Sequence, residues 1–232
     1  MALTCLVENS QIMKNNKLCL QRKLPLFLAL VLAAFFGANS RAGVQFSVKI
    51  APPPIAVFDQ PACPGDGYIW TPGYYQYGDY GYYWVPGQWV LPPAVGLLWT
   101  PGYWDHAGGS YTWHQGSWGS RVGFYGGVNY GGGYFGSGFT GGRWDGNVFR
   151  HNTAVVNVDR NNVHNTYVDR TVVQPIKGPN HSFNGRGGIT VKASSVELQA
   201  GREPHKDPTP AQVSHAQEAH DNHLAAHGKP RE

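Results

Sequence analysis

The pattern of hydrophobic and polar positions is most regular between residues 67 and 120, where four short units have nearly the same form. They read YIWTPGYY, YYWVPGQW, LLWTPGYW and YTWHQGSW, and each places a Trp three residues before a Gly. The glycines are separated by 14, 15 and 14 residues: Gly73, Gly87, Gly102 and Gly116. A fixed short period predicts one repeated structural unit. Because large rings and turn residues recur at the same places, we predict an all-β fold, a meander of short antiparallel strands.

Two strand registers are compatible with this repeat. Three of the four glycines follow a Pro, and Pro-Gly predicts a type II turn in which the Gly has a positive φ. If the segments on both sides of such a turn pair, Trp84 faces Trp89 and Trp99 faces Trp104. Type II turns splay twisted strands, so the Pro-Gly is alternatively a corner between hairpins. The hairpins are then closed by the loops GDYG (78–81), PPAVG (92–96) and HAGG (106–109), with Tyr77 opposite Tyr82 and Tyr75 opposite Trp84.

The tryptophans are predicted to form the core of these hairpins. Seven Trp and nine Tyr lie between residues 68 and 118, where aliphatic side chains are sparse, so aromatic packing has to replace an aliphatic core. The residues predicted to have this structural role are the four glycines and Trp84, Trp99 and Trp113. We expect Trp84 and Trp99 to be buried. The rings expected to be more open, and available for binding, are Trp89, Trp104 and Trp118.

Changes in composition divide the chain into six segments. They are a signal peptide (1–42), a Pro-rich linker (43–66), the aromatic repeats (67–120), a Gly/aromatic β segment (121–149), a Val/Asn-rich segment (150–173) and a polar His/Pro-rich tail (174–232). In the Gly/aromatic segment, Asp145-Gly146 predicts a further hairpin with a type I′ turn. The tail is expected to lack a packed core and to be disordered or weakly helical.

Residues 1–42 have the order of a secretory signal peptide, with basic residues, the apolar run Leu24 to Phe36 and then small residues. A membrane span needs about 20 apolar residues, which is longer than this run. We expect cleavage near Arg41 or Gly43. Removal of residues 1–42 leaves 13 of the 18 basic and 13 of the 14 acidic residues, so the basic pI belongs to the signal and implies no nucleic-acid partner. We expect export to the periplasm, the outer-membrane surface or the extracellular space, with no transmembrane span after processing. Translation starts at Met1 or Met13.

The repeat is followed by GFYGGVNYGGGYFGSGFTGGRWDGNVF and then by HNTAVVNVDRNNVHNTYVDRTVV. In this order the three stretches resemble the bacterial YXWGXW (WxxGxW) repeat proteins, and the resemblance covers about residues 68 to 173. It implies export and an aromatic β architecture, and it supplies no catalytic residue. This chain departs from the repeat at Tyr75, at Leu97 and at His114-Gln115, where the fourth unit lacks the Pro.

The search for catalytic chemistry is mostly negative. No Glu lies between Glu8 and Glu197, and the sequence contains no GxSxG, HExxH or CxxC motif. The glycines from 131 to 136 match GxGxxG, but no βαβ unit surrounds them. Cys63 is the one cysteine left after processing, so no disulfide within the mature chain is expected. We therefore expect a protein that is not an enzyme and that has no cofactor.

Two hypotheses for function remain. The first is a structural or binding protein of the envelope or cell surface, whose aromatic β-repeat binds glycan or a second copy of itself. The alternative is a periplasmic metal-binding protein. Thr209-Pro210 and Gly228 predict a helix of about 17 residues on which His220, His223 and His227 share one face. The sequence leaves open the ligand, the oligomeric state, the metal and whether the sheet closes.

Overall fold

A computed structural model of the chain describes residues 47–56, 59–173 and 180–228. All of them lie within one unit, residues 45–232. The predicted signal peptide and the first residues of the linker lie outside the described residues. Their assignment therefore stays a prediction.

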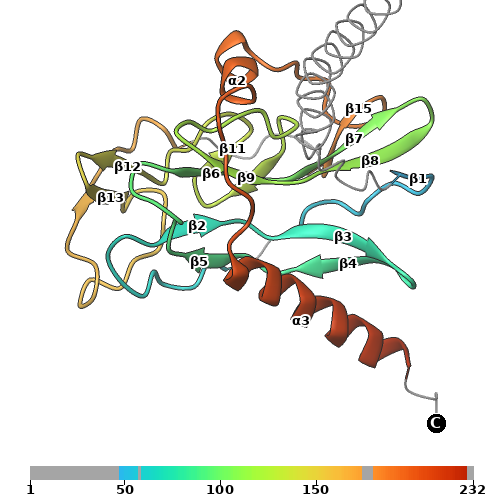
Figure 1. The fold of residues 1–232 in the computed structure, drawn as a ribbon, viewed down its shortest axis with the longest axis horizontal. Coiled ribbons are helices and arrows are strands. Elements are labelled where there is room, and N and C mark those ends of the chain that lie inside the picture. The colour runs from blue at the N-terminus through green and yellow to red at the C-terminus, as the bar shows by residue number, and fades with distance from the viewer. Residues whose placement is uncertain (1–46, 57–58, 174–179, 229–232) are drawn as a thin grey trace, which may run out of the picture. The chain divides into compact units, whose positions relative to one another are not determined.

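The first two repeat units form one long hairpin, residues 69–90, which we call the first hairpin (Figure 1). A corner interrupts each of its arms, at Pro72-Gly73 and at Pro86-Gly87. The two strands next to the closing turn, the inner strands, pair with one another. The two strands beyond the corners, the outer strands, also pair with one another. In chain order the strands are β2 (Ile69–Thr71), β3 (Tyr74–Gly78), β4 (Gly81–Val85) and β5 (Gln88–Val90).

The third and fourth units repeat this arrangement in the second hairpin, residues 98–119. Its inner pair is β7 with β8 and its outer pair is β6 with β9. The strands are β6 (Leu98–Thr100), β7 (Tyr103–Ala107), β8 (Ser110–His114) and β9 (Ser117–Gly119). The repeated structural unit is therefore a bent hairpin built from two sequence units.

This architecture decides between the two registers. The loops at 78–81 and 106–109 close hairpins, and Tyr75 lies opposite Trp84 and Tyr77 opposite Tyr82, as the second register predicted. The pairing of Trp84 with Trp89 and of Trp99 with Trp104 is wrong. The loop at 92–96 joins the two hairpins instead of closing one, because β5 pairs with β2 and β6 with β9. The tryptophan pairs across the strands are Trp70 with Trp89, Trp99 with Trp118 and Trp104 with Trp113.

The corner glycines are required for a different reason from the one predicted. None of the four has a positive φ, so the type II turn is wrong at these corners. Each glycine instead lies against the six-membered ring of a Trp. A Cβ atom would come within 2.3 Å of Trp84 at Gly73, 2.4 Å of Trp70 at Gly87, 2.4 Å of Trp113 at Gly102 and 2.5 Å of Trp99 at Gly116. The Trp-x-x-Gly spacing therefore makes room for indole rings at the point where both strands bend.

The two hairpins pack on one another through aromatic side chains. Tyr74 of β3 stacks on Trp113 of β8 with ring centroids 5.1 Å apart. The indole Nε1 of Trp104 donates a hydrogen bond to the carbonyl of Tyr75 over 2.8 Å, and the Trp104 ring meets Tyr82 edge to face at 5.3 Å. Such pairs contribute about 0.5 to 1.5 kcal/mol each beyond their buried area. The prediction that rings replace an aliphatic core is confirmed.

The Gly/aromatic segment covers the second hairpin with tyrosines. The hydroxyl of Tyr130 donates to the carbonyl of Gly102 over 2.6 Å, and that of Tyr134 donates to the carbonyl of Trp99 over 2.9 Å. The predicted hairpin at Gly146 is present, but a type I′ turn needs two residues with positive φ and only Gly146 has one there. The strands are β10 (Asn129–Gly131), β11 (Tyr134–Phe135), β12 (Gly142–Asp145), β13 (Val148–Asn152) and β14 (Thr166–Tyr167).

Not all pairing is antiparallel. β15 (Phe183–Gly185) pairs in parallel with β7, and β14 pairs in parallel with β13. Near the other end of the chain, β1 (Ser47–Val48) adds to β8 antiparallel. Within the described ranges the strands form six sheets of two to four strands. The predicted single meander is therefore right for each hairpin and wrong for the sheets as a whole.

The tail is more ordered than its composition predicted. It contains α2 (Ser195–Ala200) and α3 (Pro210–His227), and α3 has the predicted Thr209 cap, Pro at its start and Gly228 at its end. The indole Nε1 of Trp118 donates to Oε1 of Gln212 on α3 over 2.8 Å, so the tail packs on the second hairpin. No helix of the described ranges is long and apolar enough to cross a membrane.

Candidate functional site

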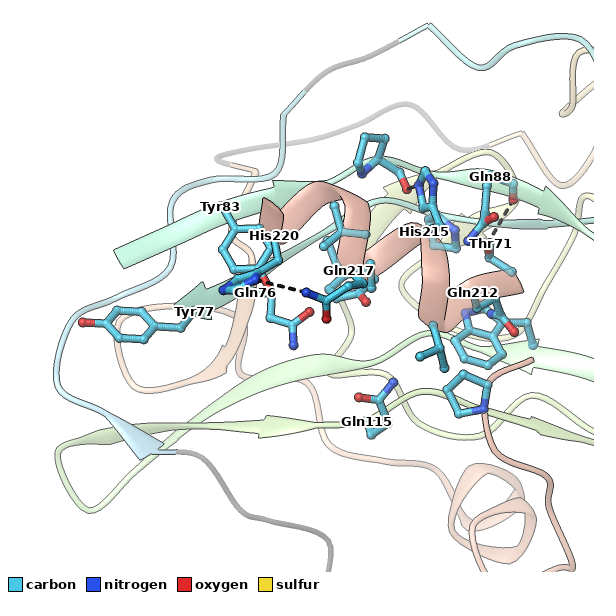
Figure 2. Close-up of a pocket in the computed structure, with 18 residues that line it drawn as sticks. Thr71, Gln76, Tyr77, Tyr83, Gln88, Gln115, Gln212, His215, Gln217 and His220 are labelled. Atoms are coloured by element: carbon cyan, nitrogen blue, oxygen red, sulfur yellow. Dashed lines mark hydrogen bonds between the residues drawn. The ribbon is translucent and has the colours of Figure 1, made fainter. Parts of the chain in front are cut away.

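The main functional candidate is a groove between α3 and the corners of the two hairpins, which we call the amide groove (Figure 2). Its volume is about 480 Å³, within the range of about 300 to 1,000 Å³ that is typical of small-molecule sites. The first hairpin contributes residues from β2, β3, β4 and β5, and α3 forms the opposite wall. The site therefore depends on packing between segments more than 100 residues apart in sequence.

Side-chain amides are the main polar groups of the groove. They come from β3, β5, the corner of the second hairpin and α3: Gln76, Gln88, Gln115, Gln212 and Gln217. The amides of Gln76 and Gln88 have no hydrogen-bond partner in the described part of the chain. Each amide offers two donor hydrogens and an acceptor oxygen. The described residues that line the groove include no Asp, Glu, Lys or Arg, and the imidazoles of His215 and His220 complete its polar lining.

Aromatic rings provide the apolar part of the lining. They are Tyr74, Tyr77, Tyr83 and Trp99. Burial raises the pKa of Tyr74 to about 12 and also raises the pKa of Tyr83, where nearby Asp221 adds to the effect. These phenols are therefore un-ionised at neutral pH. The groove therefore combines aromatic rings and amides with the imidazoles of His215 and His220.

Two polar contacts hold the first half of α3 in place as the groove wall. Gln212 receives the Trp118 indole hydrogen bond, and its Oε1 also accepts from the backbone N–H of Thr209 over 2.9 Å. Nε2 of His215 lies 2.9 Å from the carbonyl oxygen of Pro86 in the corner of the first hairpin. The contact of Gln212 with Trp118 is buried, and a buried hydrogen-bonding group costs about 1 to 3 kcal/mol when it loses its partner, so this contact fixes the position of the helix.

The three histidines of the predicted metal face come together as the helical spacing predicted. His223 stacks on Tyr83 with ring centroids 5.1 Å apart, and His227 stacks on Tyr80, also at 5.1 Å. His220 lies 5.5 Å from the Tyr83 ring. Burial lowers the pKa of His223, and the neighbouring imidazoles lower it further. Because these rings stack on Tyr80 and Tyr83, this face packs α3 on the first hairpin. Among the described residues no group of three or more His, Cys, Asp and Glu is placed to hold a metal ion.

The tryptophans predicted to form an open binding face are differently placed. Trp104 is 2 % exposed and Trp118 is fully buried, so the expectation that both lie open is wrong. The second hairpin has both the first hairpin and the tail against it, and these cover the two rings. Trp89 is half-buried, and its Nε1 donates to the carbonyl of Pro61 over 2.8 Å.

The two rings predicted to be buried differ from one another. Trp99 is 6 % exposed, as predicted, whereas Trp84 is only half-buried. Trp113, predicted to be structural, is also half-buried and stacks on Tyr74. Trp99 is the one tryptophan of the repeat that lines the amide groove.

A buried cysteine and histidine also lie close together away from the groove. Sγ of Cys63 is 3.5 Å from Nε2 of His151, and both residues are inaccessible to solvent. The thiol donates to the carbonyl of Gly65, and burial raises its pKa to about 11. A nucleophilic cysteine needs the opposite shift and an accessible sulfur. We therefore assign this pair a structural role.

Sequence reasoning missed the glutamines that define the groove. Gln76 and Gln88 occupy strand positions that alternate with aromatic residues, which indicates only an outward-facing side chain. Gln115 was visible as a departure from the repeat, because it replaces the Pro of the fourth unit. That replacement was the one signal that could have pointed to the groove.

A comparison with known protein families finds the same repeat. The WXXGXW repeat matches in two copies, at residues 65–90 and 95–118. Each copy corresponds to one bent hairpin, so the chain contains two WXXGXW repeats and the resemblance seen in the sequence is confirmed over these residues. Comparisons with curated proteins and with solved structures find no match.

Proposed function

We propose, with the two WXXGXW repeats as framework, that this chain is an exported envelope or surface protein, not an enzyme, that binds a neutral glycan in the amide groove. The observation that carries the proposal is the lining of the groove. It joins five glutamine amides and four aromatic rings in one cavity that has no charged carboxylate, ammonium or guanidinium group among its described lining residues.

A glycan matches this lining chemically. A sugar has hydroxyl groups that both donate and accept hydrogen bonds, and Gln amides are able to do the same. The carbon faces of sugar rings are apolar and pack on aromatic side chains. A charged ligand would instead need a compensating charge, because a buried charge without a partner is strongly disfavoured. The groove therefore favours a neutral polyol over an acidic or basic ligand.

Export and a non-catalytic role complete the proposal. The basic, apolar and small-residue order at the start of the chain supports secretion, and envelope glycans are outside the cytoplasm. The described residues that line the groove include no carboxylate pair such as glycoside hydrolysis uses. Its five amides do not titrate near neutral pH and are suited to holding a sugar by hydrogen bonds. The imidazoles of the lining are engaged elsewhere, His215 with the carbonyl of Pro86 and His220 with Gln217 and Asp221.

The test is retention of the mature protein on insoluble peptidoglycan and on chitin. Gln76→Ala and Gln217→Ala each remove one groove amide, and we expect each to weaken retention about fivefold, the equivalent of one lost hydrogen bond of about 1 kcal/mol. Gln199→Ala is the matched control, because Gln199 is exposed on α2 and does not line the groove. Equal retention of all four proteins would contradict the proposal. Concentration-dependent oligomers without glycan would favour self-association instead.

A further inference from the structure

A second hollow shares Gln115 with the amide groove. It is formed between the second hairpin and α2 and has a volume of about 500 Å³. Gln115 lines both hollows and is exposed. A narrow gap of about 10 Å³, also lined by Gln115, shares Trp99 with the amide groove and Pro101 with the second hollow. The two hollows therefore meet at one side chain.

The second hollow also offers hydrogen-bonding groups to a ligand. Hydroxyls, imidazoles, guanidinium groups and one carboxylate line it, at Thr100, Ser117, His114, His205, Arg121, Arg202 and Glu197. Arg121 forms an ion pair with Glu203. Arg202 is exposed and has no ion-pair partner among the described residues. Its guanidinium carries five N–H donors that are free to bind oxygen atoms.

The corner at Gln115 differs from the other three in a way that matters for a ligand. Pro72, Pro86 and Pro101 occupy the equivalent position in the other units and have no side-chain donor or acceptor. Gln115 has an amide there, and its Oε1 accepts a hydrogen bond from Nε1 of Trp113 over 3.1 Å. That bond orients the amide and leaves its NH₂ group free to donate. Figure 2 shows Gln115 on the far side of the groove from the strands of the first hairpin.

We propose that the ligand is a linear glycan strand that lies across Gln115 and fills both hollows, so that this protein recognises an extended polymer and not a single sugar or a chain end. The inference rests on the proposed function, because it deepens the ligand class of the same site. A ligand that fills two adjacent hollows gains the contacts of the second without a second association step. Affinity should therefore rise with the length of the glycan until both hollows are filled.

The experiment is calorimetric titration of the mature protein with soluble oligomers of N-acetylglucosamine, from the disaccharide upward. We expect the wild-type protein to bind the longest oligomers at least about tenfold more tightly than the disaccharide. Arg202→Ala should leave disaccharide binding unchanged and remove most of the gain with length. Gln115→Pro, which installs the residue of the other three corners, removes an amide that lines both hollows, so it should weaken binding at every length and also reduce the gain with length. Gln199→Ala is exposed on α2 outside both hollows and should behave as wild type.

The outcomes separate this inference from the proposed function. Binding of equal strength at every length would overturn the extended site and leave glycan binding in the amide groove intact. The same would follow if Arg202→Ala and Gln115→Pro both kept the full gain with length. Absence of binding at every length would overturn both proposals. Melting temperatures of the variants, measured alongside, identify any variant that loses binding because it fails to fold.

Discussion

Replacing Gly87 by Ala tests the reason that we give for the corner glycines. The new Cβ would lie 2.4 Å from Cζ2 of Trp70 and 2.9 Å from the backbone nitrogen of Gly73, whereas ordinary contacts are 3.4 to 4 Å. About 1 Å of space is therefore missing on the ring side. Since Gly87 has no positive φ, the expected cost is steric and not conformational.

The surroundings of Trp70 determine the size of the effect. The ring is fully buried and meets Trp89 edge to face at 5.3 Å. On another side, a Cβ on Gly132 would be only 2.7 Å from Cδ1 of the same indole, which shows how closely the backbone approaches it. Overpacking a core costs about 1 to 3 kcal/mol of stability. Because the indole of Trp70 has no room to move away, we expect the cost of Gly87→Ala to lie at the upper end of that range. For a domain of this size, about 3 kcal/mol lowers Tm by roughly 6 to 12 °C.

Thermal unfolding followed by circular dichroism measures this shift. Gly65→Ala is the matched control, because its Cβ would meet nothing closer than 3.8 Å. A double-mutant cycle with Trp70→Phe isolates the ring contact, since Phe has a single ring and lacks the outer fused ring that carries Cζ2 of the indole. In that background Gly87→Ala should cost less than about 1 kcal/mol. The steric argument is wrong if Gly87→Ala has the same Tm as Gly65→Ala. It is also wrong if Gly87→Ala costs as much free energy of unfolding in the Trp70→Phe background as in the wild type.

Three further predictions follow from the described contacts and from the signal sequence. Burial lowers the pKa of His223, so the docking of α3 is stable above the ordinary value of about 6.5 and weakens as the pH falls below it. His223→Phe, which keeps the stacking, should flatten the pH dependence of Tm, and an unchanged slope would refute this. Trp118→Ala should cost about 3 to 5 kcal/mol in denaturant titrations and Trp89→Ala clearly less, because only Trp118 is fully buried; equal costs would contradict that. N-terminal sequencing of exported protein should begin near Arg41 or Gly43, and a protein that keeps residues 24–36 would disprove processing.

Local features of the fold were predictable because they depend on neighbours in the sequence. The register that pairs Tyr75 with Trp84 follows from the position of one loop, since a turn sets the pairing of the strands that it joins. The ends of α3 follow from Thr209-Pro210 and Gly228, which act on backbone groups within one helical turn. These predictions needed no knowledge of what the hairpins or the helix contact.

Predictions that depended on packing between segments failed. Trp104 and Trp118 were expected to be open because the alternation along one strand gives the face of a side chain but not what covers that face. The first hairpin covers Trp104, through the contact with Tyr82, and α3 covers Trp118, through Gln212. The amide groove depends on the same long-range contacts. No period or motif in the sequence links Gln76 with Gln217.

At each corner of the repeat the Gly is structurally required, whereas the residue before it is free to vary. Each corner has a Gly beside an indole ring, and a Cβ at any of the four would come within 2.5 Å of that ring. The residue before the Gly has no such restriction, because the fourth corner keeps its Trp, Gly and strand pairing with Gln115 in place of Pro. A side chain at that position projects from the bend of a hairpin without disturbing the ring beneath it. In this chain the single exception to Pro lies where two hollows meet, which is where a binding amide is most useful.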